Sequence, residues 1–158
     1  MKILLVAATR AEIEPFLLHH GFHHLPSNEK RIGKNTVRIL ISGAGMVATA
    51  FAMGMYFNKE SFDLAINAGI AGSFDPSFQP GDLCRVREDI LAEFGAEDGE
   101  DFLTSDIIGL GKSTYQAGSI PGFPIYDQLR EVKAVTVNKV HGNELSIAEF
   151  VSGFHPQI

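Results

Sequence analysis

The chain of 158 residues has one cysteine, no tryptophan and no long uninterrupted apolar segment. The single cysteine, Cys84, excludes a framework of intrachain disulfides and is typical of a reducing compartment. No apolar segment approaches the roughly 18 to 20 residues that a transmembrane helix needs. The apolar segment Ile3 to Ala8 is also shorter than the apolar region of a signal peptide. These absences predict a cytoplasmic protein.

Positive charge is also scarce. The chain has 13 lysine and arginine residues against 19 aspartate and glutamate residues, so its formal net charge is −6. No stripe of basic residues stands out that could follow a nucleic acid or an anionic membrane surface. The composition therefore favours a small-molecule ligand, with no nucleic acid and no membrane as partner.

The residues that are present predict a single α/β domain over residues 1–158. Hydrophobic residues make up 45% of the chain, and 16 residues are glycine. Continuous apolar runs at Lys2 to Ala8, Leu64 to Ala68 and Val132 to Val137 are typical of buried strands. Further elements are expected as a hairpin of Lys30 to Lys34 with Thr36 to Ser42, a strand at Leu83 to Val86, and helices after Thr9, up to about Phe57, and at Leu145 to Gly153.

A glycine-rich corner, Asn67 to Gly72, follows the strand predicted at Leu64 to Ala68. Gly69 and Gly72 allow a sharp turn and a close approach of the backbone to a ligand. Open α/β sheets bind small molecules at the carboxyl ends of their strands, which makes this corner a candidate site. On the glycines alone, a purely structural turn is an equally good interpretation.

Glu12 also has two interpretations. Thr9 is suited to cap the helix that follows, and Glu12 stands three residues later, where a capping box has its acidic partner. The same residue lies just beyond the carboxyl end of the first strand, where active sites gather. The residues alone leave both roles open.

Two motifs suggest ligands that their surroundings do not support. Gly43 to Ala48 matches the dinucleotide pattern G-x-G-x-x-A, but Asp63 stands at the beginning of the next strand rather than at its end, where it could reach a ribose. His19 to His24 has metal-ligand spacing, but Gly21 interrupts the helix that this spacing requires. Neither a nicotinamide cofactor nor zinc is predicted.

Two later segments predict surface loops. Glu88 to Asp101 holds seven carboxylates in fourteen positions and is expected to be a solvated loop, because it has no calcium-binding pattern. Gly109 to Pro124 is rich in glycine, serine and proline, which predicts a long surface loop.

Several motifs, taken together, resemble the nucleoside phosphorylase/nucleosidase superfamily. In chain order they are Met1-Lys-Ile with Ala8-Thr-Arg-Ala-Glu12, Ser42-Gly-Ala-Gly-Met46, Ile66-Asn-Ala-Gly-Ile-Ala-Gly72, Gly81-Asp82 and Asn138-Lys-Val-His-Gly142. Within the superfamily, the chain looks most like futalosine hydrolases, through Ala7-Ala-Thr-Arg-Ala-Glu12, Asn67-Ala-Gly-Ile-Ala-Gly-Ser-Phe74, Phe94-Gly-Ala-Glu-Asp98 and Thr136-Val-Asn-Lys-Val-His-Gly142. The resemblance implies an α/β, three-layer phosphorylase/hydrolase-like fold with a central mixed β-sheet whose C-terminal part is missing.

The resemblance also implies an activity. Futalosine hydrolases cut the N-glycosidic bond of futalosine in menaquinone biosynthesis, releasing hypoxanthine and dehypoxanthine futalosine. The alternatives are a methylthioadenosine/S-adenosylhomocysteine nucleosidase and a noncatalytic nucleoside-binding or structural remnant. The partners implied are a purine nucleoside and a second copy in a homodimer, with no metal or organic cofactor.

Roles for individual residues follow from the same resemblance. Glu12 matches the carboxylate that positions and activates the attacking water. Asn67 stands where related phosphorylases have a phosphate-binding arginine, and a neutral amide cannot replace that charge, so water is the expected nucleophile. The other site residues implied are Ala8 and Thr9 beside the ribose, Gly45 and Met46 on its 5′ side, Ile70, Ala71 and Gly72 against the purine, Phe94 stacking on it, and the Val140 backbone at the base edge.

The chain departs from the superfamily at two places. Ile70 stands where related nucleosidases have a serine. Superfamily members also continue past the position of Ile158 into a Met-Glu pair that holds the ribose hydroxyls and a group that assists the leaving base. The expectation is therefore a fragment or a truncated, weakly active or inactive form.

Overall fold

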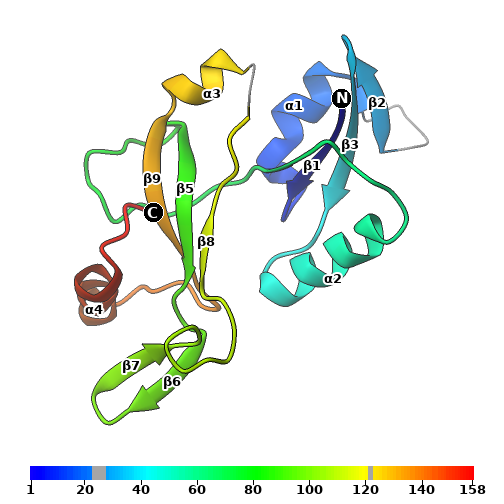
Figure 1. Ribbon diagram of the computed structural model, residues 1–158. Coiled ribbons are helices and arrows are strands. Elements are labelled where there is room, and N and C mark those ends of the chain that lie inside the picture. The colour runs from blue at the N-terminus through cyan, green and yellow to red at the C-terminus, as the bar shows by residue number, and fades with distance from the viewer. Residues whose placement is uncertain (23–27, 121–122) are drawn as a thin grey trace. The chain divides into compact units, whose positions relative to one another are not determined.

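The computed structural model describes residues 1–22, 28–120 and 123–158, which form two compact units, residues 1–70 and 71–158 (Figure 1). The prediction of one domain over the whole chain stays a prediction. Within the described ranges, no helix has the length and apolar character needed to cross a bilayer.

The first unit is built on a four-stranded mixed sheet in the order β2-β3-β1-β4. Strand β1 (Lys2–Ala7) lies between β3 (Asn35–Ile41) and β4 (Leu64–Asn67) and is parallel to both. Strand β2 (Glu29–Ile32) pairs with β3 in the predicted hairpin, which Gly33 closes with a φ of 59°. The strands and hairpin predicted for this part of the chain are therefore confirmed.

Helices cover both faces of this sheet because the residues of β1 are apolar without alternation. On one face, Leu5 and its neighbours pack against Leu17 of α1 (Glu14–His19), which follows a 3-10 turn, η1, at Ala11–Ile13. On the other face, Leu4 packs against α2 (Met46–Phe57). The predicted three-layer arrangement is present in this unit.

Leu4 is fully buried at the centre of this unit. Replacing it with alanine leaves a cavity between the sheet and α2, and we expect the free energy of unfolding to fall by about 2 to 5 kcal/mol. Urea denaturation followed by circular dichroism measures the change. Val47→Ala removes an apolar side chain that is 84% exposed, so it should change stability little. A Leu4→Ala loss as small as that of the control would contradict this packing.

The predicted buried strand at Leu64 to Ala68 is buried on one face only. Strand β4 is the edge of the four-stranded sheet. Leu64 and Ile66 pack on the core, whereas Ala65 and Asn67 are exposed. A continuous apolar sequence does not reveal which strand stands at an edge.

The second unit has a three-stranded mixed sheet in the order β8-β5-β9. Strand β5 (Cys84–Leu91) lies between β8 (Thr114–Gln116), antiparallel to it, and β9 (Arg130–Thr136), parallel to it (Figure 1). The remaining elements are the hairpin of β6 (Gly95–Asp98) and β7 (Asp101–Thr104), and the helices α3 (Pro124–Gln128) and α4 (Glu144–Phe154).

Two loop predictions are wrong in this unit. The acidic segment Glu88 to Asp101 is mostly strand, because it contains the end of β5, the whole of β6 and the start of β7. Its carboxylates are not all solvated: Asp89 accepts a hydrogen bond from the Thr136 hydroxyl at 2.8 Å, and burial raises its pKa. The segment Gly109 to Pro124 is not one continuous surface loop, since it contains β8.

Candidate functional site

The carboxyl ends of three parallel strands meet at one edge of the first unit. Hydrogen bonds between backbone groups continue past the ends of the strands: the Ser42 N–H donates to Ala7 O at 2.9 Å, and the Gly43 N–H donates to Ala8 O at 3.1 Å. On the other side, the Ala68 N–H donates to Val6 O at 2.9 Å. The segments after β1, β3 and β4 are therefore neighbours, as expected for a ligand site of an open α/β sheet.

The carboxylate of Glu12 lies among these segments. One of its oxygens accepts the Thr9 N–H at 2.6 Å and the Thr9 hydroxyl at 3.1 Å. The other accepts the Ile70 N–H at 3.3 Å. These contacts tie the segment after β1 to the glycine corner after β4, although 58 residues separate Glu12 from Ile70.

The predicted helix cap is only partly right. Glu12 accepts the Thr9 N–H, which is the acidic half of a capping box. The Thr9 hydroxyl donates to the same carboxylate instead of accepting from the backbone, and the chain enters a 3-10 turn at Ala11 without a side-chain cap. A cap does not require the additional bond from Ile70, so the carboxylate has a function in the corner as well.

Hydrogen bonding keeps Glu12 ionised. Burial by itself raises the pKa of this carboxyl, but the hydrogen bonds from Thr9, Ile70 and Ala8 outweigh burial and hold its pKa below the ordinary value of 4.5. The group is therefore a carboxylate at neutral pH. It can accept a hydrogen bond from a water molecule or a sugar hydroxyl.

Gly69 leaves room for this carboxylate. A Cβ atom at this position would lie 2.8 Å from Glu12 Oε1, closer than atoms can approach without moving. At Gly72, in the same glycine-rich segment, an added Cβ would meet no atom within 4 Å. A side chain at position 69 would therefore displace the Glu12 carboxylate from its observed place.

Gly45 and Met46 lie where the segment after β3 enters α2. Gly43 and Gly45 have φ values of 84° and 94°, which side-chain-bearing residues rarely adopt. Helix α2 begins at Met46, directly after this turn. The Ser42 hydroxyl lies 3.1 Å from the Thr49 hydroxyl, which holds the turn to the helix. The structure thus places both predicted residues at the same sheet edge as Glu12.

Asp63 lies away from the glycines of the dinucleotide pattern. The Asp63 carboxylate accepts the Lys2 N–H at 2.6 Å, at the amino end of β1. Gly43 and Gly45 stand at the carboxyl ends of the strands, which is the opposite edge of the sheet. Asp63 therefore cannot bind a ribose whose phosphates rest on those glycines.

Four predicted site residues, Ala71, Gly72, Phe94 and Val140, lie in the second unit, whereas Asn67 ends β4 in the first. Phe94 follows the end of β5 and Val140 follows the end of β9, and these two strands are parallel neighbours. Phe94 is 47% exposed and Val140 is 95% exposed. Ala71 and Gly72, also exposed, stand at the start of the unit. A single site that joins these residues to Glu12 stays a prediction.

Glu93 and His141 are candidates to which no sequence motif assigns a role. Glu93 accepts the Asn138 N–H at 2.5 Å, and His141 Nε2 lies 3.1 Å from its carboxylate. Both residues border predicted positions, Phe94 and Val140. Their positions next to Phe94 and Val140 could have marked them as candidates. Their contact with each other could not be predicted from the sequence, because 48 residues separate them.

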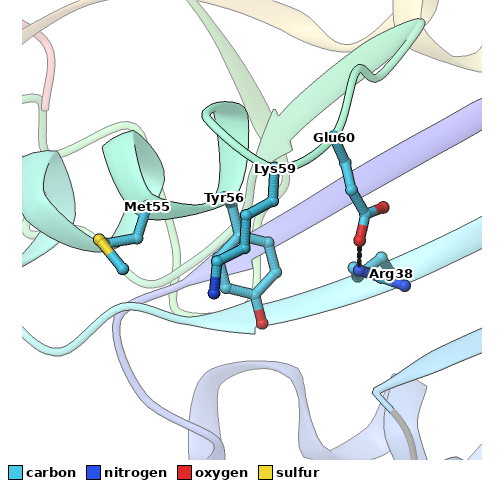
Figure 2. A pocket seen from close by; sticks show the side chains of 5 residues that line it. All are labelled: Arg38, Met55, Tyr56, Lys59 and Glu60. Atoms are coloured by element: carbon cyan, nitrogen blue, oxygen red, sulfur yellow. Dashed lines mark hydrogen bonds and ion pairs between the residues drawn. The ribbon is translucent and has the colours of Figure 1, made fainter.

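A pocket of about 230 Å³ lies near the C-terminal end of α2, lined by Arg38, Met55, Tyr56, Lys59 and Glu60 (Figure 2). Arg38 forms ion pairs with Glu60 and, at 2.7 Å, with Glu29. Helix α2 has 12 residues and is about 18 Å long, so this pocket is well separated from Gly45 at the other end. Arg38 and Glu60 are paired with each other, and the pocket is not part of the Glu12 site.

No group of three metal-ligating side chains occurs in the part of the chain that the structure describes. His23 and His24, which belong to the histidine segment considered for zinc, lie outside the described residues.

Comparison with known proteins gives sequence matches to two nucleosidases, and no family model matches the chain. A 5′-methylthioadenosine/S-adenosylhomocysteine nucleosidase of Pseudoalteromonas translucida is 33% identical over 90 residues, which cover 57% of this chain and 32% of that protein. The nucleosidase of the same name from Colwellia psychrerythraea is 30% identical over 105 residues, covering 63% of this chain and 40% of that protein. The matches thus span well under half the length of these relatives.

Solved structures match almost the whole chain. The nucleosidase MTAN of Helicobacter pylori aligns with a TM-score of 0.75 at 15% identity, covering 99% of this chain and 76% of that one. Futalosine hydrolase of the same organism aligns with a TM-score of 0.71 at 15% identity, covering 99% and 75%. The S-adenosylhomocysteine nucleosidase of Streptococcus pyogenes gives 0.67 at 18% identity, covering 100% and 72%. The chain therefore has the mixed α/β fold of these proteins and accounts for part of it.

Proposed function

We propose that the chain belongs to the nucleoside phosphorylase/nucleosidase superfamily and carries part of the site of a purine nucleosidase. The observation that carries the proposal is the ionised Glu12 carboxylate, held at the carboxyl ends of three parallel strands and bonded to the glycine corner at Ile70. The sequence matches to two nucleosidases and the shared fold support it.

The chemistry of this site follows from the carboxylate. As the N-glycosidic bond breaks, its electron pair leaves with the purine and the sugar acquires oxocarbenium character. Glu12 orients a water molecule toward the anomeric carbon and accepts its proton as the new C–O bond forms. A carboxylate of lowered pKa is a weak base, which suffices because the electrophile is reactive. Ala8 and Thr9 would border the ribose, and Gly45 and Met46 its 5′ side.

Water is the proposed nucleophile because the corner offers no phosphate-binding cation. Asn67, at the end of β4, is neutral and exposed. Arg10 is near Glu12 in sequence, but its Nε lies 3.9 Å from Glu14 Oε1, and this carboxylate partly offsets its charge. Base release that rose strongly with added phosphate would contradict this choice.

Two substrate classes are candidates. The curated relatives act, by their names, on methylthioadenosine and S-adenosylhomocysteine, which makes these nucleosides the first candidates. Futalosine is the second, because the motifs around Glu12, Asn67 and Val140 resemble futalosine hydrolases and because a futalosine hydrolase shares the fold. Ile70 in place of a serine also separates this corner from the first class.

A substrate panel distinguishes the candidates. Chromatography of the released base should show adenine from methylthioadenosine, or hypoxanthine from futalosine, but not both at similar rates. Calorimetry with the same nucleosides tests the remaining alternative, a noncatalytic nucleoside-binding remnant. Binding without release of base would favour that remnant over the nucleosidase.

The decrease of kcat/KM at low pH should follow the protonation of Glu12. Its pKa is lowered below 4.5, so we expect kcat/KM to be nearly constant between about pH 7 and 5 and to fall as the pH drops through the pKa of Glu12. The stabilising hydrogen bonds of the carboxylate should be present above pH 4.5 and lost over that same lower range. Initial rates in overlapping buffers measure this profile. A decrease centred near pH 6 or 7 would assign the essential base to another group.

We also propose a homodimer in which the β6–β7 hairpin contributes to the contact between copies. Phe94, just before β6, and Phe102, in β7, are 47% and 40% exposed. Exposed aromatic side chains on a hairpin are typical of contact surfaces between proteins.

A further inference from the structure

Glu93 fastens the segment Asn138 to Gly142 to the end of β5. Its carboxylate accepts the Asn138 N–H at 2.5 Å and contacts His141 Nε2 at 3.1 Å. These two contacts lie on either side of Val140. One carboxylate thus binds the segment twice within four residues.

The pair is largely shielded from water. The His141 side chain is 6% exposed, and its ring lies 4.2 Å, centroid to centroid, from Phe150 in α4. His141 Nδ1 is buried and has no hydrogen-bond partner among the described residues. A carboxylate oxygen only accepts hydrogen bonds, so Nε2 carries a proton and donates it to Glu93.

Val140 lies in the sequence between the two residues that Glu93 contacts. Its side chain is 95% exposed, so packing of the side chain cannot fix its backbone. Glu93 is also the residue directly before Phe94, whose own N–H donates to Leu91 O at 3.2 Å. The same carboxylate therefore connects the residue predicted to stack on the purine with the residue predicted to face the base edge.

We infer that Glu93 and His141 are a positioning pair that sets the Val140 backbone relative to Phe94 and so shapes the purine-binding face of the second unit. This inference rests on the proposed function, since it assigns the purine to Phe94 and Val140. The pair acts through those two positions and does not itself contact the substrate. Its loss should weaken binding of the base more than it slows the chemical step.

Amide hydrogen exchange and base binding, measured on the same variants, test this inference. In Glu93→Gln, the Asn138 amide should exchange at least about tenfold faster, because a bond to a charged acceptor is lost. The Kd for adenine or hypoxanthine and the KM of the nucleoside should rise about tenfold, while kcat changes less than about threefold. His141→Phe keeps an aromatic ring beside Phe150 and should show the same weakening.

Two further variants make the result specific. His141→Gln retains a donor that can reach Glu93 and should recover part of the affinity that His141→Phe loses. Glu131→Gln is the matched control, because Glu131 forms an ion pair with Arg85 at 2.9 Å in the same unit, away from the segment. It should leave exchange at Asn138 and base affinity unchanged.

Unchanged exchange at Asn138 in Glu93→Gln would overturn the inference. Faster exchange with unchanged Kd and KM would also overturn it, because the pair would then serve stability alone. If the unmodified protein neither binds a purine nor cleaves a nucleoside, the proposed function fails instead, and exchange at Asn138 still decides whether Glu93 holds the segment.

Discussion

Replacement of Glu12 by glutamine is expected to lower kcat for nucleoside cleavage by about 10²- to 10⁴-fold, the usual contribution of a general base. Glutamine has the same size and can still accept the Thr9 N–H through its carbonyl oxygen. It cannot take a proton from water, and its NH₂ group must face one of the donors, Thr9 or Ile70, that now surround the carboxylate. The affinity for the free purine should change little, because Glu12 serves the water and not the base.

Glu14→Gln is the matched control for this variant. Glu14 lies two residues further on, and its side chain is 50% exposed beside Arg10. It should retain nearly full activity, since exposed ion pairs contribute little. Steady-state kinetics of both variants, with calorimetry of purine binding, measure the difference. A Glu12→Gln enzyme with normal kcat would remove the proposed role of this carboxylate.

Gly69→Ala is expected to lower kcat by about 100-fold with little change in stability. The new Cβ would lie 2.8 Å from Glu12 Oε1, and the end of a flexible side chain moves more readily than the backbone. The carboxylate should therefore swing out of place, and a misplacement of about 1 Å can cost about 10² in rate. The thermal midpoint should fall by no more than a few degrees, because no buried apolar contact is lost.

Gly54→Ala provides the comparison for Gly69→Ala. It adds the same methyl group in α2, at a position outside the predicted site, where no atom lies within 4 Å. Its kcat should remain within about threefold of the parent value. Equal activity of the two variants would show that the close approach of Glu12 to Gly69 has no role in catalysis.

The elements of the first unit could be predicted because their signals are local. An unbroken apolar run predicts β1, and alternation with Gly33 predicts the hairpin of β2 and β3. The turn before α2 follows from its glycines. The bond between Glu12 and Ile70 is different, because it depends on strand order, which periodicity does not contain.

The acidic segment shows where composition misleads. Seven carboxylates in fourteen residues predict a solvated loop, yet Asp89 and Glu93 each bind a partner more than 40 residues away. A count of charges cannot reveal such partners. The neighbouring residues Gly95 to Asp98 form β6 because β7 supplies backbone partners, which lie outside any local pattern.

Incorporation of ¹⁸O from labelled water tests the central claim most directly. The protein, as the 158-residue chain or as part of a longer product of its gene, is incubated with methylthioadenosine or futalosine in H₂¹⁸O, and the sugar product is analysed by mass spectrometry. Hydrolysis assisted by Glu12 predicts release of the free base and one ¹⁸O atom at the anomeric carbon, with no dependence on phosphate. Formation of a sugar 1-phosphate, or no release of base from either nucleoside, would contradict it.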